Sequence, residues 1–235
     1  MLGKVILFSG SSAVGKTAVL HWLLPLLQAN HCAPSLCKID CVDQVADRQM
    51  TGMTIPYVLG VSGDICPDHF LVSNLPELFA WSESHEADTL VIETAGLCHR
   101  CSPASEHMIA GCVIDCTAST KAPESLGPML MHADFIVVTK IDRVSQAERE
   151  IILWKLQSLN PLAKVFPVDA LAGYGVEPLC DYLVSAPSRD DFQGDELRHT
   201  MPTGVCSYCV GERRIGSDYQ QGSVGKIEFA GENHA

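Results

Sequence analysis

Residues 10–17 read Gly10-Ser11-Ser12-Ala13-Val14-Gly15-Lys16-Thr17, which fills every fixed position of the pattern G-x-x-x-x-G-K-[ST]. The glycines let successive backbone N–H groups curl around phosphate oxygens. Lys16 places a cation at the β- and γ-phosphates, and Thr17 offers a hydroxyl to Mg²⁺. An apolar run over 5–8 precedes the segment, and a helix-like run over 17–29 follows it. This setting predicts a phosphate-binding loop whose anion site gains from the helix dipole.

Strand-like and helix-like segments alternate along the first 185 residues. Pro25 is expected to kink or shorten the first helix, and residues 41–73 read as polar and irregular. We predict a doubly wound, mostly parallel α/β sheet of the P-loop NTPase type, with ligands at the carboxyl ends of its strands. The expected strands are 4–9, 35–40, 89–94, 111–116, 135–139 and 164–168, and the expected helices are 16–29, 75–85, 124–132, 145–159 and 176–184.

The composition changes after Pro187, where Asp, Gly, Arg and Gln become frequent. We therefore predict a nucleotide-binding domain over 1–186 and a short cysteine-containing appendix over 187–235, with one strand at 224–229. The formal net charge is −12 and no Lys/Arg cluster is present, which argues against nucleic acid and anionic membranes as partners. No run approaches the roughly 20 apolar residues of a membrane span. The short N-terminal apolar run is unlike a signal peptide, so a cytoplasmic location is expected.

Two acidic residues end predicted strands near the loop. Glu93 closes the apolar run 90–92 and is followed by Thr94-Ala95-Gly96; a carboxylate there can hold Mg²⁺ through water, and Gly96 can approach the γ-phosphate. Asp40 ends the second strand, where an acid orients the attacking water or the Mg²⁺ shell, or serves only as a turn residue. We predict Lys16, Asp40 and Glu93 as catalytic residues, and Thr17, Glu93 and Asp40 as the magnesium site.

A second motif, Thr139-Lys140-Ile141-Asp142, directly follows an apolar strand. It resembles the guanine-reading N/T-K-x-D element, in which the acid accepts hydrogen bonds from guanine N1–H and the exocyclic amine. Adenine lacks both donors and would leave Asp142 unpaired. Residues 168–171 resemble the loop that contacts guanine O6 through backbone N–H groups. GTP and GDP are therefore the expected nucleotides, and the predicted binding residues are Gly10, Ser11, Ser12, Ala13, Val14, Gly15, Lys16, Thr17, Lys140, Asp142, Ala170 and Leu171.

The chain contains 11 cysteines, which in a reducing compartment indicate metal or redox chemistry rather than structural disulfides. Two C-x-x-C pairs occur, Cys98/Cys101 beyond Glu93 and Cys206/Cys209 in the appendix. The pairs complete one tetrahedral site, or each pair meets its twin across a dimer axis. Thiolates suit Zn²⁺, Cu⁺ or an iron–sulfur cluster, and Cys with His suits Ni²⁺ or Zn²⁺. We expect the following to be buried small apolar residues: Cys32, Cys37, Cys41, Cys112, Cys116 and Cys180.

Residues 1–185 resemble the CobW/HypB/UreG family of SIMIBI-class GTPases, which includes the nickel-insertion GTPases of urease and hydrogenase. The likeness is carried by V-I-E-T-A-G-L at 91–97, similar to I-E-T-T-G-L, and by G-V-S-G-D-I-C-P-D-H at 60–69, similar to G-V-E-T-G-G-C-P-H. It implies that Cys66 and His69 bind nickel or zinc, although one residue separates Pro67 from His69. It also implies a homodimer with nucleotide bound. Positions 11–14 lack the additional lysine of the ATPase branch.

These features predict a GTPase that delivers a metal to a client metalloenzyme or accessory protein. The predicted metal ligands are Cys66, His69, Cys98, Cys101, Cys206 and Cys209. One alternative is a redox or electron-transfer NTPase with an iron–sulfur cluster bridged between subunits. Another is a regulatory GTPase whose cysteines form a structural zinc knuckle for partner docking.

Overall fold

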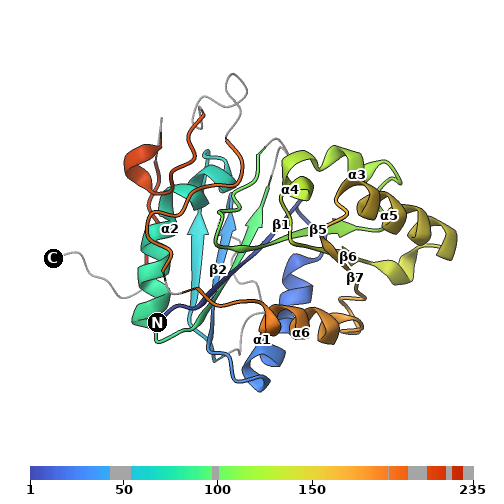
Figure 1. The fold of residues 1–235 in the computed structure, drawn as a ribbon, viewed down its shortest axis with the longest axis horizontal. Coiled ribbons are helices and arrows are strands. Elements are labelled where there is room, and N and C mark those ends of the chain that lie inside the picture. Colours follow the sequence, from blue (N-terminus) through green and yellow to red (C-terminus); the bar gives the residue numbers. More distant parts are fainter. Residues whose placement is uncertain (43–53, 97–100, 190, 201–210, 221–223, 230–235) are drawn as a thin grey trace.

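The computed structural model describes residues 1–42, 54–96, 101–189, 191–200, 211–220 and 224–229. Its centre is a parallel sheet of seven strands in the order β3-β2-β4-β1-β5-β6-β7 (Figure 1). Strand β1 lies in the middle and is flanked by β4 and β5, so the phosphate-loop segment leaves the sheet where ligands of this fold class bind. The strands are β1 (Lys4–Gly10), β2 (Pro34–Asp40), β3 (Tyr57–Val61), β4 (Thr89–Ala95), β5 (Ile109–Asp115), β6 (Phe135–Thr139) and β7 (Lys164–Pro167).

Helices cover both faces of the sheet. In β1, Ile6 and Phe8 pack with α1 and α6, whereas Val5 and Leu7 pack with α2. All four are fully buried, as expected when alternate residues of a central parallel strand face two helical layers. The doubly wound prediction is therefore confirmed. The helices are α1 (Lys16–Ala29), α2 (Pro67–Ser84), α3 (Ala122–Ser125), α4 (Gly127–Met131), α5 (Gln146–Leu159) and α6 (Val176–Ser185), with 3₁₀ turns η1 (Ile141–Arg143) and η2 (Ser217–Tyr219).

The structure differs from the predicted elements mainly between β2 and β4. Residues 57–61 form edge strand β3 within the stretch expected to be irregular, and α2 begins at Pro67 rather than at residue 75. Gly60 makes this stretch look unlike a strand in the sequence. The structure needs glycine there because a Cβ would lie 2.5 Å from Ile39 Cδ1. The first turns of α2 carry buried polar side chains, which conceal the helical periodicity. Pro25 does not shorten α1, which continues to Ala29.

Within the described part of 187–229, η2 and residues 224–229 contact α2, whereas Leu197 forms an isolated β-bridge with Ser105 (Figure 1). Phe192, Leu197 and Ile215 join the apolar cluster that contains Leu7 and Leu78. Residues 224–229 have irregular backbone rather than the predicted strand, because a side chain supplies their polar contacts. Asn74 donates to the Gly225 carbonyl at 2.9 Å and accepts the Ile227 N–H at 3.1 Å. A domain boundary at residue 186 stays a prediction.

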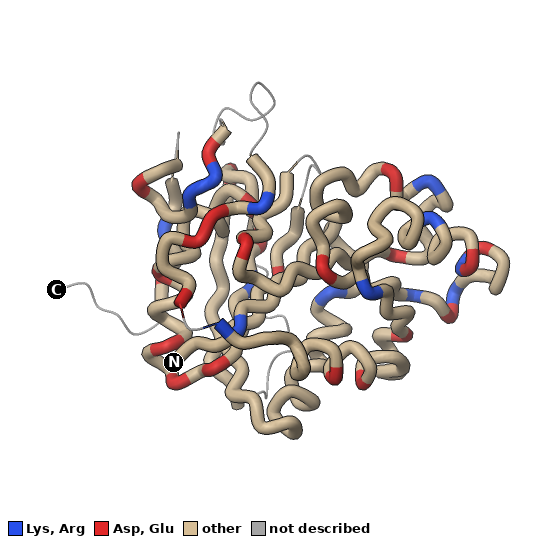
Figure 2. The backbone as a smooth tube through the Cα atoms, in the orientation of Figure 1, with Lys and Arg blue, Asp and Glu red and all other residues tan. Residues whose placement is uncertain are grey.

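Charged residues of both signs are distributed along the described backbone (Figure 2). Arg198 is the most heavily bonded of them, since its guanidinium donates to both carboxylate oxygens of Asp134 at 2.9 Å and to the Ser105 carbonyl. This fork joins the C-terminal segment to the start of β6. Among the helices of the described residues, none has the length and apolar character that crossing a bilayer requires.

Candidate functional site

The loop over 10–17 joins β1 to α1, as predicted. A Cβ at Gly10 would lie 2.6 Å from the Val113 carbonyl oxygen, so the loop approaches β5 more closely than any side chain allows. Gly15 precedes the helix with φ 97°, a left-handed conformation that glycine adopts without strain. These two positions explain why the pattern needs glycine at both ends of the loop.

Lys16 lies across this loop. Its ammonium donates to the carbonyls of Gly10 at 2.9 Å and Ser11 at 2.7 Å, and the residue is 4% exposed. Burial lowers the pKa of Lys16, while the nearby Glu93 carboxylate raises it. A desolvated ammonium gains more from an anionic partner than a surface lysine does. The arrangement therefore favours a phosphate group in the loop.

Two predicted magnesium ligands meet at the end of β4. Thr17 Oγ1 donates to Glu93 Oε1 at 2.8 Å, and Glu93 is 4% exposed. A hydroxyl and a carboxylate side by side are the hard oxygen ligands that Mg²⁺ prefers, so the residues present fit this ion. Asp40 ends β2 at the same edge, where its Oδ1 accepts the Cys41 N–H at 2.7 Å. That bond is a turn contact, and the magnesium and catalytic roles of Asp40 stay predictions.

One residue of this site was missed by sequence reasoning. Lys38 of β2 is 8% exposed, and its Nζ donates to Thr17 Oγ1 at 3.4 Å. The available signal was a lysine inside a strand whose other positions up to Ile39 are apolar or small. Such a position is unusual for lysine, which is rarely buried without a partner.

The predicted guanine-reading residues line a second part of the same edge. A cavity of about 160 Å³ lies between the phosphate loop and the segments that follow β6 and β7. The structure therefore brings the predicted base-binding segments together beside the phosphate loop. The cavity is lined by Gly15, Ala18, Thr139, Lys140, Asp142, Arg143, Asp169, Ala170 and Leu171.

Thr139 and Lys140 attach this base-side segment to the phosphate loop. The buried Thr139 hydroxyl lies 2.5 Å from the Val14 carbonyl oxygen, and Lys140 Nζ donates to the Ala13 carbonyl at 3.0 Å. Lys140 also donates to Asp115 at the end of β5. Burial raises the pKa of Asp115, but the hydrogen bonds from Lys140 and from Thr117 together lower it by more, so the net shift is downward. Asp115 was not predicted, and its only signal is its place at a strand end.

The segment after β7 is shaped by Asp169. Its Oδ1 accepts the N–H groups of Leu171 at 3.0 Å and Ala172 at 3.2 Å. The Ala170 carbonyl accepts the Trp22 indole N–H at 3.1 Å. The Leu171 and Ala172 amides are thus already engaged within this segment.

A cysteine cluster lies at the start of α2. Cys66 directly precedes the helix, and the pKa of its thiol is lowered to about 6. The largest cause is a hydrogen bond from Cys101, and the backbone amides of His69 and Asp68 lower the pKa further, whereas desolvation raises it. A thiol of this pKa is largely thiolate at neutral pH. The structure therefore brings together Cys66 and Cys101, which are 35 positions apart in the sequence.

Asp68 joins this cluster to β4. It is fully buried, accepts the Thr94 hydroxyl at 3.2 Å and lies 3.6 Å from Cys101 Sγ. Burial, followed by the charge of Cys66, raises the pKa of Asp68 to about 7. A Cβ on Gly96 would lie 3.3 Å from Asp68 Oδ2. The expected γ-phosphate segment therefore packs directly on the cluster.

The remaining predicted metal ligands are not brought to Cys66 and Cys101 by the described structure. His69 is fully buried in the first turn of α2, and Cys98, Cys206 and Cys209 lie outside the described residues. Within the described ranges, no group of three or more His, Cys, Asp or Glu side chains is arranged to hold a metal ion. Cys37, Cys112, Cys116 and Cys180 are buried, as predicted, and Cys32 and Cys41 are partly exposed. Burial raises the pKa of Cys112 to about 12.

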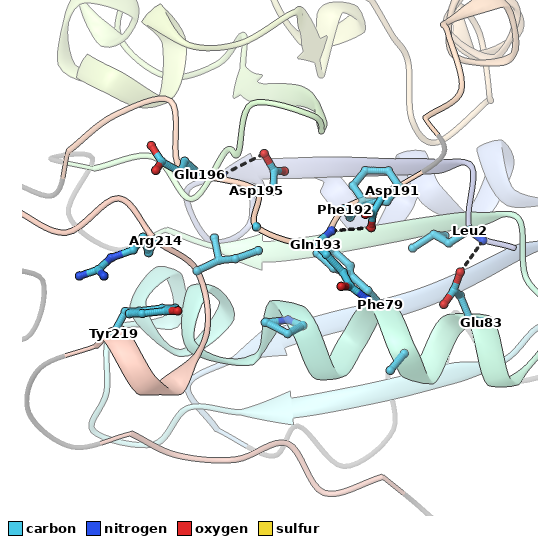
Figure 3. A pocket seen from close by; sticks show the side chains of 14 residues that line it. Leu2, Phe79, Glu83, Asp191, Phe192, Gln193, Asp195, Glu196, Arg214 and Tyr219 are labelled. Atoms are coloured by element: carbon cyan, nitrogen blue, oxygen red, sulfur yellow. Dashed lines mark hydrogen bonds between the residues drawn. The ribbon is translucent and has the colours of Figure 1, made fainter.

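A larger cavity of about 500 Å³ lies away from this edge, between α2 and the C-terminal segment (Figure 3). Phe79, Phe192 and Ile215 contribute apolar surface, and Glu83 and Asp191 contribute carboxylates that accept backbone N–H groups. None of the predicted nucleotide or metal residues lines it. The cavity is therefore separate from the candidate site.

Comparisons with known proteins agree with this geometry. Residues 4–167 match the family model described as CobW/HypB/UreG, nucleotide-binding domain. An uncharacterized protein of Methanocaldococcus jannaschii is 37% identical over 226 residues, covering 96% of each chain. The urease accessory protein UreG 2 of Streptomyces griseus is 29% identical over 191 residues, covering 75% of this chain and 84% of its own.

The fold is likewise similar to solved structures. HypB from Helicobacter pylori, solved in complex with nickel, has a TM-score of 0.61 at 19% identity, with 80% of this chain and 91% of that chain covered. The hydrogenase maturation factor HypB from Archaeoglobus fulgidus also has a TM-score of 0.61, at 20% identity, with 77% and 88% covered. At this identity the likeness concerns the fold alone. The family match over most of the chain establishes that the protein belongs to the CobW/HypB/UreG family.

Proposed function

We propose that this protein is a GTP-hydrolysing metallochaperone whose affinity for a transition metal depends on the bound nucleotide. The observation that carries the proposal is the contact between two sites. The cysteine cluster packs on Gly96, at the end of the strand that also supplies Glu93 to the phosphate site. Loss of the γ-phosphate on hydrolysis would shift the end of this strand, and that shift would be transmitted to the thiols through the contact between Gly96 and Asp68.

The nucleotide roles follow from the geometry of the loop edge. Lys16 and the loop N–H groups bind and stabilise phosphate charge. Thr17 and Glu93, with Asp40, would hold Mg²⁺, which offsets negative charge on the β- and γ-phosphates when bound. Asp142 would accept hydrogen bonds from the guanine edge, and the Ala170 amide would donate to its O6. These assignments predict that guanine nucleotides bind more tightly than adenine nucleotides.

The cargo roles belong to the thiols. Cys66 is largely thiolate at neutral pH, and the Cys101 thiol already contacts it, so a soft or borderline metal would displace one proton and join the two sulfurs. Cys98, Cys206, Cys209 and His69 are the proposed further ligands. Ni²⁺ and Zn²⁺ are the proposed cargo, because related proteins are urease accessory proteins and a fold relative was solved with nickel.

The test compares two nucleotide states in one preparation. Anaerobic protein is titrated with Ni²⁺ and with Zn²⁺ in the presence of Mg²⁺ and either GDP or GTPγS. We expect the metal affinity to differ at least tenfold between the two states, and to fall in both for Cys66→Ser and Cys101→Ser. Cys180→Ser, which alters a buried cysteine of α6, is the matched control. Equal affinity with GDP and GTPγS would overturn the coupling.

The same preparation separates the alternatives. A brown iron–sulfur chromophore would favour the redox NTPase. Nucleotide-independent zinc binding, with Cys206→Ser unfolding only the C-terminal segment, would favour the regulatory GTPase with a zinc knuckle. A nucleotide-dependent homodimer, a client metalloenzyme or accessory protein as partner, and a cytoplasmic location complete the proposal, and sedimentation with GDP and GTPγS tests the dimer.

A further inference from the structure

We propose that Lys38 is a second phosphate-binding cation of the nucleotide site, which contacts the γ-phosphate and makes the protein prefer nucleoside triphosphates over diphosphates. The inference rests on the proposed nucleotide binding and adds a residue that the loop motif does not contain. No part of it concerns the metal cargo.

The sheet register places Lys38 beside the predicted magnesium ligands. In the parallel pairing of β2 with β4, Lys38 is opposite Glu93, and paired residues of neighbouring strands point to the same face of a sheet. The Lys38 ammonium donates to Thr17 Oγ1 at 3.4 Å, and the same hydroxyl donates to Glu93 at 2.8 Å. Lys38 therefore reaches the side of the loop where Thr17 and Glu93 would hold Mg²⁺ beside the phosphates.

Burial distinguishes this lysine from the others. Among the lysines that the structure describes, only Lys16 and Lys38 are buried, at 4% and 8% exposure. Both ammonium groups lie at the same sheet edge, and the positive charge of Lys38 acts on Lys16. Two like charges in a desolvated site repel each other, so placing both ammonium groups there costs least when a highly charged anion binds between them.

The charges of the site indicate which anion this is. Two cations, Lys16 and Lys38, face the carboxylates of Glu93 and Asp40, and the Asp68 carboxyl also acts on Lys16. Without Lys38, carboxyl groups would outnumber cations around the loop. A triphosphate with one Mg²⁺ is about two charges negative, and the chain as a whole carries −12. Lys16 already lies over the loop carbonyls of Gly10 and Ser11. The Lys38 side chain is flexible and lies on the Thr17 side, so its ammonium can contact the γ-phosphate, which a diphosphate lacks.

The alternative is that Lys38 serves only as a structural counter-charge for Glu93. The two roles differ in what removal of the ammonium does to diphosphate and triphosphate. A counter-charge supports Glu93 with either nucleotide, whereas a γ-phosphate contact exists only with the triphosphate. The ratio of GDP to GTPγS affinity therefore separates them.

The experiment measures GTPγS and GDP affinities in Mg²⁺ for the full chain by calorimetry. For Lys38→Met we expect GTPγS affinity to fall about 10- to 100-fold, the size of a lost charge-assisted hydrogen bond, and GDP affinity to change less than about threefold. Lys38→Arg keeps the charge and should keep most of the preference. Lys4→Met is the matched control, because Lys4 donates to the Leu183 and Val184 carbonyls of α6.

Equal losses for GDP and GTPγS in Lys38→Met would overturn the inference and leave the proposed function intact. If wild-type protein binds neither nucleotide, the proposed function itself fails. Should Lys38→Met not fold, Lys38→Gln can still donate to Thr17 and replaces it in the same measurement. An unchanged GTPγS-to-GDP preference in that variant would likewise overturn the inference.

Discussion

The nucleotide edge and the cysteine cluster are built in opposite ways, although they touch at Gly96. At the nucleotide edge, loop carbonyls accept hydrogen bonds from functional side chains, as Lys16 and Thr139 show. In the cluster, side chains hold one another: Cys66, Asp68 and Cys101 exchange polar contacts in a buried space. The first kind of site is rigid before a ligand arrives, and the second depends on protonation and on what binds there.

The largest expected effect is a loss of nucleotide binding that leaves metal binding unchanged. Lys16→Ala removes the cation that lies over the loop, so we expect GTPγS and GDP affinity to fall by about 1,000-fold or more, on the scale of several charge-assisted bonds. Metal affinity without nucleotide should stay within about twofold. Calorimetry with each ligand checks both values. A loss of metal binding in the absence of nucleotide would show that the two sites are one.

The second prediction tests the protonation of the cluster. Asp68 has a raised pKa of about 7, so the folded state favours the protonated carboxyl. Its contribution to stability is complete below the ordinary aspartate pKa near 4 and is lost as pH rises through 7. In chelator-treated protein, wild type should lose on the order of 2–4 kcal/mol relative to Asp68→Asn between pH 4 and pH 8.

Urea denaturation at several pH values measures this difference. Asp195→Asn, another buried carboxyl, is the control for a general effect of charge removal. Parallel stability curves for wild type and Asp68→Asn would contradict the assignment.

The third prediction concerns the base-binding side of the nucleotide edge. Asp142→Ala removes the acceptor for two guanine donors, so GTPγS affinity should fall about 10- to 100-fold while ATPγS affinity changes little. Competition binding with both nucleotides measures the discrimination. Exposed Asp181 of α6 provides a matched variant, Asp181→Ala, which should leave both affinities unchanged. Equal loss for both nucleotides would argue against base recognition by Asp142.

The smallest expected effect concerns the contact between α2 and residues 224–229. Asn74→Ala leaves the Gly225 carbonyl and the Ile227 N–H without the partner they have in the structure, and we expect unfolding free energy to fall by about 1–2 kcal/mol. Nucleotide affinity should not change. Hydrogen exchange should locate the effect at 224–229 and α2. Faster exchange at the phosphate loop instead would show that the C-terminal segment supports the nucleotide edge.

The same contrast explains what the sequence could predict. The phosphate loop and the base-binding segments are local patterns that follow apolar strands, so their positions and their meeting at one sheet edge could be inferred before the structure. Strand β3 could not, because Gly60 is required for close packing against Ile39 rather than for strand formation. The start of α2 was hidden by buried polar residues such as Asp68 and Ser73.

Long-range pairs were beyond sequence reasoning for a different reason. Cys66 and Cys101 meet because β4 and α2 lie against each other, and their spacing does not encode that packing. Lys38 was overlooked because a single lysine in an apolar strand indicates a surface position as readily as a site. Asp115 is linked to the phosphate loop through Lys140, and a single acid at a strand end forms no recognisable motif.

The bond from Thr139 to the Val14 carbonyl has a kinetic consequence. Thr139 and Lys140 donate to successive loop carbonyls, those of Val14 and Ala13. We therefore expect the base-binding segment after β6 and the phosphate loop to move together. The base and the phosphates of a bound nucleotide are then expected to be released together rather than one after the other. We expect spontaneous exchange of GDP to be slow, and any partner that accelerates exchange to act by separating the residue-139 segment from the loop.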